Sequence, residues 1–386
     1  MRHPITLWIL LASLGLPGTP LRAEPRQHPA ASVIEFSEDG LPIIRVALHA
    51  LKPPGKTRTC RFLVSTGQDV TILDHSVPTE FYWDASGTTS FPDATGASHA
   101  LPAVLVKRLE VAGLVRDGVA GARADLKRAA GLDLDEPVDG ILGMSFLRGT
   151  RFVYDPGAGR IRWWQEPAPG ATLPLVYSAN HLPLAMLTVG TTQVQASPDI
   201  GRMGGLDLPW SLKPAGEGRP VHSQAMLGDA APGQFHELGR VEAGAGAWTR
   251  VLASFHPGMP DGGIGQDVWS AAPAGFDFIQ DRLTLHLDAA GRLPIRAQPR
   301  LTLPVFWDRS GPAPRLVVVA VKAGSPMAEA GCRPGDELVR AGTLSGRALN
   351  RRSLMALMDQ AKPHAWTVLR EGRPEQLHMF RAKQGD

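Results

Sequence analysis

The chain contains an internal repeat, and a repeat limits the possible folds more strongly than composition does. In residues 40–67 a strand-like segment is followed by a turn, a second strand and a tight turn of sequence Ser-Thr-Gly. Residues 181–201 show the same order and end in a tight turn of sequence Asp-Ile-Gly. Each tight turn ends in glycine, which tolerates backbone conformations and close approaches that other residues do not.

The repeat continues downstream of both turns. Residues 139–163 contain the sequence Asp-Gly-Ile-Leu-Gly and then two strand-like segments joined by a turn. Residues 261–287 follow the same order, beginning with Asp-Gly-Gly-Ile-Gly. The two copies predict two β-rich lobes of similar length, over residues 33–166 and 171–290, with residues 167–170 as a linker.

After residue 287 the pattern changes, which predicts a separate α+β domain over residues 302–381. A strand-like run at 316–321 leads to a short helix that ends at Gly331. A turn, another strand and an amphipathic helix over 350–360 follow, and a terminal hairpin completes the unit.

The first residues predict export. Arg2 precedes an apolar run over residues 5–16, and the small residue Ala23 follows a Pro- and Gly-containing break. This pattern is typical of a cleavable signal peptide, here residues 1–23, and predicts a periplasmic or secreted protein. The later sequence contains no run long and apolar enough to predict a membrane span once the signal is removed.

Composition excludes several function classes. The chain has 40 basic and 37 acidic residues, 43% hydrophobic residues and no basic block, so we expect a soluble globular protein that does not bind nucleic acid. Its two cysteines, Cys60 and Cys332, lie in apolar patterns in different predicted domains, and we expect two buried thiols. Without metal-ligand spacing or a nucleotide-binding fingerprint, the sequence predicts no metal and no cofactor.

Residues 62–74, an apolar strand, the Ser-Thr-Gly turn and a β-branched strand, resemble the active-site segment of retropepsin-like aspartic peptidases. Residues 141–143 resemble the element that crosses behind that loop in the same fold. Counted over both copies, the resemblance covers about residues 33–290 and implies two retropepsin-like β-barrel lobes. The predicted fold class is therefore mainly β, followed by the α+β domain.

The resemblance also implies a chemistry. In these peptidases each lobe supplies one aspartate, and the pair shares a proton across a bound water. One carboxylate then acts as the base toward water while the protonated partner polarises the substrate carbonyl. Only Asp199 matches this role, because Ser65 stands where the first lobe should have its aspartate. The other matching positions are Thr66, Gly67, Ile200 and Gly201, where Ile200 replaces the usual threonine.

Three hypotheses follow from this departure. The protein binds peptides without cutting them; or Asp69, four residues after Ser65, supplies the missing charge in an active endopeptidase; or the segment is a turn of an unrelated β-barrel. A serine nucleophile at Ser65 is less favoured, because the nearest histidine in sequence, His75, has no orienting acid except Asp74.

Two further features concern the ligand. The family resemblance implies a flap over the site, and residues 85–100 match it in place and composition, with Gly96 at the tip. Residues 324–338 resemble a PDZ domain of the bacterial protease type, a fold that binds extended peptides by strand addition. The partner implied by both modules is a polypeptide in extended form, while the oligomeric state stays open. Pro312 and Pro314 remove N–H donors where PDZ domains capture a terminal carboxylate.

Overall fold

The computed structural model describes residues 31–37, 40–51, 55–92, 98–126, 137–216, 218–223, 231–259, 261–295, 305–308, 315–318, 321, 326–349, 353–354, 357 and 363–379. The predicted signal peptide, the predicted flap tip at Gly96 and most of the predicted helix over 350–360 lie outside these residues.

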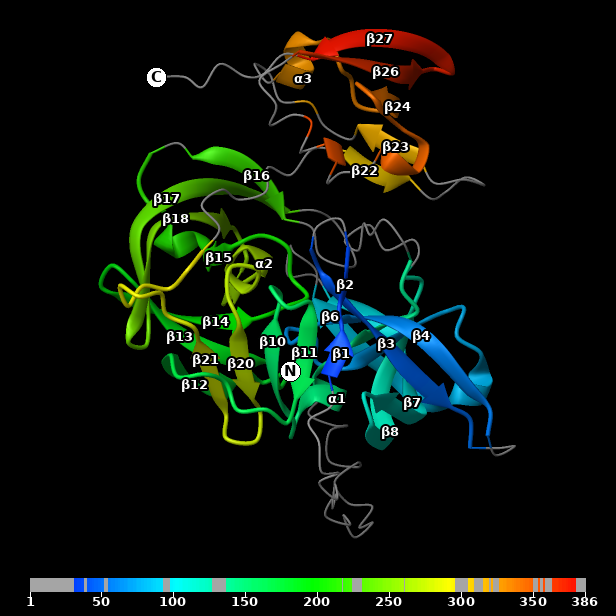
Figure 1. Ribbon diagram of the computed structural model, residues 1–386, viewed down its shortest axis with the longest axis vertical. Helices are drawn as coiled ribbons and strands as arrows, with labels where there is room; N and C mark the ends of the chain where they lie inside the picture. Colours follow the sequence, from blue (N-terminus) through cyan, green and yellow to red (C-terminus); the bar gives the residue numbers. More distant parts are fainter. Residues whose placement is uncertain are drawn as a thin grey trace, which may run out of the picture.

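The described chain is mainly β, as the sequence predicted, and its strands form sheets of 13, 8 and 6 strands. Figure 1 shows two β-rich lobes side by side and a smaller C-terminal unit beyond them. The helices are short, and three-residue 3-10 turns occur at Thr79–Phe81, Trp210–Leu212 and Gly346–Ala348.

Lobe 1 is a closed barrel. Its strands follow one another in a ring that the pairing of the first with the last completes: β3 (Pro42–His49), β4 (Thr57–Val64), β9 (Gly140–Leu142), β5 (Thr71–Asp74), β8 (Leu114–Ala124) and β7 (Ser98–Val111). The sheet is extended at its two ends by β2 (Glu35–Phe36) and β6 (Tyr82–Pro92). Inward-facing apolar residues alternate with outer ones, as the period of a strand requires.

Lobe 2 closes in the same order. Its ring consists of β13 (Pro183–Val189), β14 (Thr192–Pro198), β19 (Gly262–Ile264), β15 (Leu206–Pro209), β18 (Gly246–His256) and β17 (Ala231–Ala243), and β13 pairs with β17. The sheet is extended by β12 (Ala171–Tyr177) and β16 (Arg219–Ser223). Each ring contains two parallel pairs: β4 with β9 and β5 with β8 in lobe 1, and β14 with β19 and β15 with β18 in lobe 2. The pairs β4–β9 and β14–β19 bring the crossing strand behind the tight turn.

A short helix follows each crossing strand: α1 (Met144–Leu147) after β9 and α2 (Gln266–Trp269) after β19. The glycine before each helix allows the backbone to pass close to the neighbouring loop. A Cβ on Gly143 would lie 2.5 Å from the Val70 carbonyl oxygen, and one on Gly265 would lie 2.7 Å from that of Gly204. These positions therefore require glycine for space.

The lobes are joined by a run of strands that both contribute: β1 (Ala31–Val33), β11 (Arg160–Trp163), β10 (Arg151–Asp155), β20 (Ala274–Asp277), β21 (Arg282–Leu285) and β12. Strand β10 of lobe 1 pairs directly with β20 of lobe 2. Across this pair the rings of Phe152 and Phe276 stack with centroids 5.1 Å apart. One hydrophobic cluster extends through both lobes, so the two barrels share a core.

The C-terminal unit has a hydrophobic core of its own. Its elements are β22 (Val305–Asp308), β23 (Arg315–Val318), α3 (Pro326–Glu329), β24 (Glu337–Ala341), β25 (Leu344–Ser345), β26 (His364–Arg370) and β27 (Arg373–Met379). The turn before β24 is fixed by Asp336, whose carboxylate accepts hydrogen bonds from the Arg333 N–H and from two guanidinium nitrogens of Arg370, each at 2.8 Å. Such a bidentate pair is among the stronger polar contacts in proteins.

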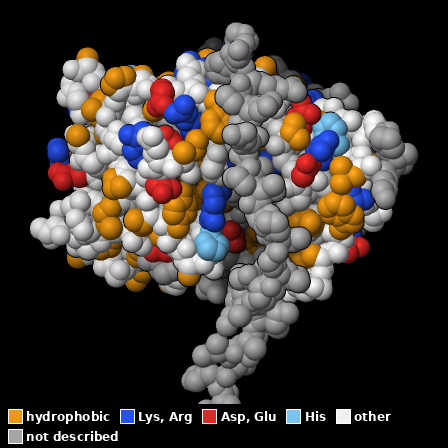
Figure 2. Space-filling view, turned by 90° about the horizontal axis from the view of Figure 1, so that it is seen from below, with side chains coloured by type: hydrophobic (Ala, Val, Ile, Leu, Met, Phe, Trp, Pro, Cys, Tyr) orange, Lys and Arg blue, Asp and Glu red, His pale blue; other side chains and the backbone are white. Residues whose placement is uncertain are grey.

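The two cysteines are free and buried, Cys60 in the shared core of the lobes and Cys332 in the C-terminal core, as the sequence predicted. On the face shown in Figure 2, the described acidic and basic side chains are interspersed with hydrophobic ones. Within the described ranges, no helix combines the length and the hydropathy needed to cross a bilayer.

Candidate functional site

The site lies where the tight turn after β4 meets the tight turn after β14. The Ser65 hydroxyl donates a hydrogen bond to Asp199 Oδ1 over 3.0 Å. Each turn is anchored by an equivalent hydrogen bond to the crossing strand behind it. The Ser65 N–H donates to the Leu142 carbonyl, and the Asp199 N–H donates to the Ile264 carbonyl. The structure thus brings together the two residues that the sequence placed at the centre of the site.

Both turns depend on glycine for their close approach. A Cβ on Gly67 would lie 2.5 Å from Asp199 Oδ2, and a Cβ on Gly201 would lie 2.6 Å from the Ser65 Cβ. Real side chains do not tolerate such contacts, so each glycine makes room for the first residue of the opposite turn. The contact between the turns is therefore reciprocal in shape.

The hydrogen bonding between the turns is not reciprocal. The Thr66 hydroxyl donates to the Pro198 carbonyl and accepts from the Ile200 N–H at 3.2 Å. Ile200 occupies the corresponding position but has no hydroxyl to return these bonds. Both side chains are fully buried. One threonine thus makes the polar connection that the family resemblance would have two residues share.

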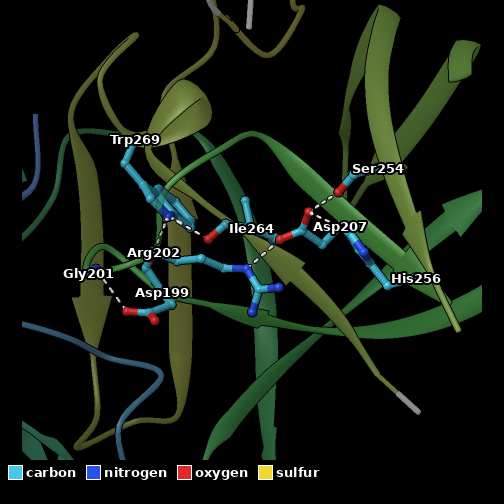
Figure 3. A network of polar contacts seen from close by, with 8 residues as sticks. All are labelled: Asp199, Gly201, Arg202, Asp207, Ser254, His256, Ile264 and Trp269. Atoms are coloured by element: carbon cyan, nitrogen blue, oxygen red, sulfur yellow. Dashed lines mark hydrogen bonds and ion pairs between the residues drawn. The ribbon is translucent and has the colours of Figure 1, made fainter. Parts of the chain in front are cut away.

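Asp199 is held by donors from both turns. Besides the Ser65 hydroxyl, its carboxylate accepts the Gly201 N–H at 2.8 Å and the Gly67 N–H, while the Trp269 indole donates to its carbonyl at 2.9 Å (Figure 3). Burial raises the pKa of Asp199 above the ordinary value, although these N–H groups, Ser65 and the charge of Arg202 act in the opposite direction. The protonated form of Asp199 is therefore favoured relative to an exposed aspartate.

Asp69 is not among the groups that act on the Asp199 carboxylate. Burial raises the pKa of Asp69, and the charges that oppose this shift come from His181 and Arg148. Its carbonyl accepts the Ser145 N–H at 2.8 Å, at the start of α1. Among the described residues no hydrogen bond joins Asp69 to Asp199. Asp69 thus belongs to the surroundings of α1 and His181.

A buried polar network lies beside Asp199 in lobe 2, and the sequence analysis did not identify it. Arg202 follows the tight turn, and its Nε donates to Asp207 Oδ2 on β15 at 2.5 Å. From β18, the Ser254 hydroxyl donates to Asp207 Oδ1, and His256 Nε2 lies 3.7 Å from the same oxygen (Figure 3). Figure 3 shows the Arg202 side chain lying between Asp199 and Asp207.

The charges of this network stabilise one another. Burial would raise the pKa of Asp207, but Arg202, His256 and Ser254 together hold it well below its ordinary value. Burial likewise opposes the charge of Arg202, yet Asp207 raises the pKa of Arg202 above its already high ordinary value. Both groups are therefore ionised at any ordinary pH, as paired buried charges must be.

The network occupies strand positions that are apolar in lobe 1, as a comparison of the strand register in the two lobes shows. Ile72 on β5 pairs with β9 and with Ala122 on β8. Asp207 on β15 pairs in the same way with β19 and with Ser254 on β18, so Ile72 and Asp207 occupy equivalent positions in the two lobes. An aspartate at a strand position that is isoleucine in the other copy is the anomaly. Comparing the repeat residue by residue past the tight turns would have exposed it.

Within the ranges that the structure describes, no cluster of His, Cys, Asp and Glu side chains has an arrangement able to hold a metal ion. The predicted flap lies in the hairpin of β6 and β7, but Gly96 itself is outside the described residues. No model of a known protein family matches the chain, and no curated protein matches its sequence significantly.

Proposed function

We propose that the chain is an exported homologue of retropepsin-like aspartic peptidases that binds extended polypeptides at the Ser65–Asp199 site and does not cut them. The main support is the 3.0 Å hydrogen bond from Ser65 Oγ to Asp199 Oδ1. In the place where the two turns meet, a hydroxyl stands opposite the carboxylate. The catalytic pair of this peptidase type consists of two carboxylates there.

The missing carboxylate matters for the chemistry. Hydrolysis of a peptide by this mechanism needs a base that takes a proton from water and an acid that polarises the carbonyl. A serine hydroxyl neither ionises nor shares a proton with Asp199 in the accessible pH range. General acid–base assistance contributes about a hundred- to ten-thousand-fold in rate, so loss of one partner should leave little turnover.

The same groups are suited to binding. The raised pKa of Asp199 favours a protonated carboxyl, which can donate a hydrogen bond. The Ser65 hydroxyl uses its one hydrogen in the bond to Asp199, and its oxygen can accept a further hydrogen bond. A donor beside an acceptor matches the C=O and N–H groups of an extended peptide. The PDZ-like sequence of the C-terminal unit supports a second site for an extended polypeptide, and the N-terminal sequence supports function outside the cytoplasm.

The competing hypothesis is an active endopeptidase that uses Asp199 with Asp69. Asp69 bonds Ser145 at the start of α1 through its carbonyl and forms no hydrogen bond with Asp199, which favours the binding function instead. This hypothesis makes a different prediction for the Asp69→Asn variant, so one experiment compares the two.

The experiment incubates an unfolded protein and a peptide library with wild type and with the Ser65→Asp, Asp199→Asn and Asp69→Asn variants across pH. We expect wild type to bind peptides without cleaving them. Ser65→Asp should gain cleavage at acidic pH, and adding Asp199→Asn to it should abolish that gain. Asp69→Asn should behave as wild type. Cleavage by wild type that Asp69→Asn abolishes would establish the endopeptidase instead.

A further inference from the structure

Only one of the three guanidinium nitrogens of Arg202, Nε, is hydrogen-bonded to a described residue. Its Nε is bonded to Asp207, while its two terminal nitrogens form no hydrogen bond with any described residue. The Arg202 side chain is 27% exposed, compared with 12% for the Asp207 side chain. The side chain is therefore partly accessible, and two guanidinium nitrogens remain without a hydrogen-bond partner among the described residues.

This free end lies near the proposed site. Arg202 follows Gly201 directly in the chain, and its charge acts on the Asp199 carboxylate. The two groups nevertheless form no ion pair with each other, since Asp199 takes its hydrogen bonds from Ser65, Gly67 and Gly201. Arg202 thus supplies positive charge beside the site without being neutralised by Asp199.

The surroundings hold the guanidinium in one orientation. Asp207 is bonded at one oxygen by Arg202 and approached at the other by the buried residues Ser254 and His256, so the four residues form one connected unit (Figure 3). Gly263 provides the space, because a Cβ there would lie 2.8 Å from Arg202 Cζ. A guanidinium already held in place loses little conformational entropy when it binds a ligand.

We infer that Arg202 is a specificity-determining residue, which binds a carboxylate of the polypeptide bound at the Ser65–Asp199 site; this inference depends on the proposed function. A guanidinium presents two parallel N–H donors that match the two oxygens of a carboxylate. The carboxylate comes either from an Asp or Glu side chain of the ligand or from its C-terminus. The preferred ligands are therefore peptides with an acidic group next to the residue that contacts Asp199.

Lobe 1 has no arginine at the position equivalent to Arg202, so the two sides of the site differ in charge. Gln68 follows Gly67 as Arg202 follows Gly201, and the carbonyls of both residues accept the first N–H of the following short helix. Gln68 has no charge to offer a carboxylate. An acidic group should therefore be recognised only on the lobe 2 side of Asp199, so the ligand is bound in one orientation.

The test measures binding of labelled peptides by fluorescence anisotropy. One pair of peptide sets differs only in Glu against Gln, and a second pair differs only in a free against an amidated C-terminus. The proteins are wild type, Arg202→Gln, which copies Gln68, and Arg202→Lys, which keeps the charge but not the paired donors. A fourth protein, referred to below as the fourth variant, combines Arg202→Gln with Asp207→Ile, Ser254→Ala and His256→Ala, which are the residues at these positions in lobe 1. It leaves no buried charge unpaired.

We expect wild type to bind the carboxylate-bearing member of one pair roughly tenfold more tightly than its neutral match. Arg202→Gln and the fourth variant should lose this preference while still binding the neutral peptides, and Arg202→Lys should keep part of it. The Glu pair and the C-terminal pair show which source supplies the carboxylate. Equal binding of charged and neutral peptides by wild type, or a preference that survives in the fourth variant, would overturn this inference alone. Failure of wild type to bind any peptide would overturn the proposed function together with it.

Discussion

The two lobes close their barrels by the same strand pairings, yet they differ in the layer beneath their tight turns. In lobe 1 this layer belongs to an apolar cluster that contains Ile72, Ala122, Ala124 and Ile141. In lobe 2 the corresponding strand positions are Asp207, Ser254, His256 and Gly263. The same backbone thus accommodates either an apolar layer or a buried ion pair.

This difference bears on function. Removing two charges from water is costly, and replacing a buried ion pair by well-packed apolar residues is often neutral or stabilising. Lobe 1 shows that an apolar solution fits this architecture. The charged layer lies in the lobe that keeps the acidic residue of the site, beside Asp199. We therefore interpret the network as serving ligand binding rather than stability.

The largest expected effect comes from breaking the network at one partner. Asp207→Ala leaves the partly buried Arg202 guanidinium without its counter-charge and the buried Ser254 and His256 without their acceptor. We expect this to lower the free energy of unfolding by about 3–5 kcal/mol at pH 7. A conservative change at the equivalent position of lobe 1, Ile72→Val, should cost only about 0.5–1.5 kcal/mol, because it removes no charge or hydrogen bond. Denaturant unfolding of both variants measures the contrast.

The cause can be separated from simple loss of packing. Adding Arg202→Gln to Asp207→Ala removes the orphaned charge, so the double variant should be more stable than Asp207→Ala alone. The pKa of Asp207 is lowered in the folded state. Its contribution to the free energy of unfolding is therefore complete above its unfolded pKa and declines as the pH falls. A penalty for Asp207→Ala that is unchanged by Arg202→Gln would show that the ion pair is not the source.

A medium effect is expected at the contact between the turns. Thr66→Val keeps the shape of the side chain but removes the hydroxyl that bonds the Pro198 carbonyl and the Ile200 N–H. Two buried backbone groups lose their partner, so we expect a loss of about 1–3 kcal/mol in the free energy of unfolding. Ile200→Val, which breaks no hydrogen bond, should cost about 0.5–1.5 kcal/mol. Equal losses would contradict the one-sided connection.

The sequence predicted a large part of the architecture. Strand periodicity and the turn glycines gave the mainly β fold, and burial of Cys60 and Cys332 followed from their apolar patterns. The site was predictable because the tight turns have short, specific sequences. Their meeting, with Ser65 bonded to Asp199, is a consequence of two strands that leave their barrels toward each other.

The network and the position of Asp69 were not predicted, for different physical reasons. Asp207 and His256 lie 49 residues apart and meet only through the parallel pairing of β15 with β18, which no local pattern reveals. Asp69 is close to Ser65 in sequence, but the chain turns after Gly67 and carries it toward α1. Sequence distance alone could not distinguish these two cases.

The smallest expected effect compares the two acids of lobe 2 by the sign of their pH dependence. Burial raises the pKa of Asp199 in the folded state, so its proton is held more tightly there than in the unfolded chain. The resulting stability is complete below the unfolded pKa, about 4, and is lost as the pH rises through the folded value. Asp199→Asn cannot ionise, so its stability relative to wild type should increase across this window.

The same measurement on Asp207→Asn should show the opposite slope, because the pKa of Asp207 is lowered. Unfolding by denaturant at a series of pH values gives both difference curves. Slopes of the same sign would mean that Asp199 is not desolvated as its contacts require, and would remove the argument that its carboxyl serves as a donor to the ligand.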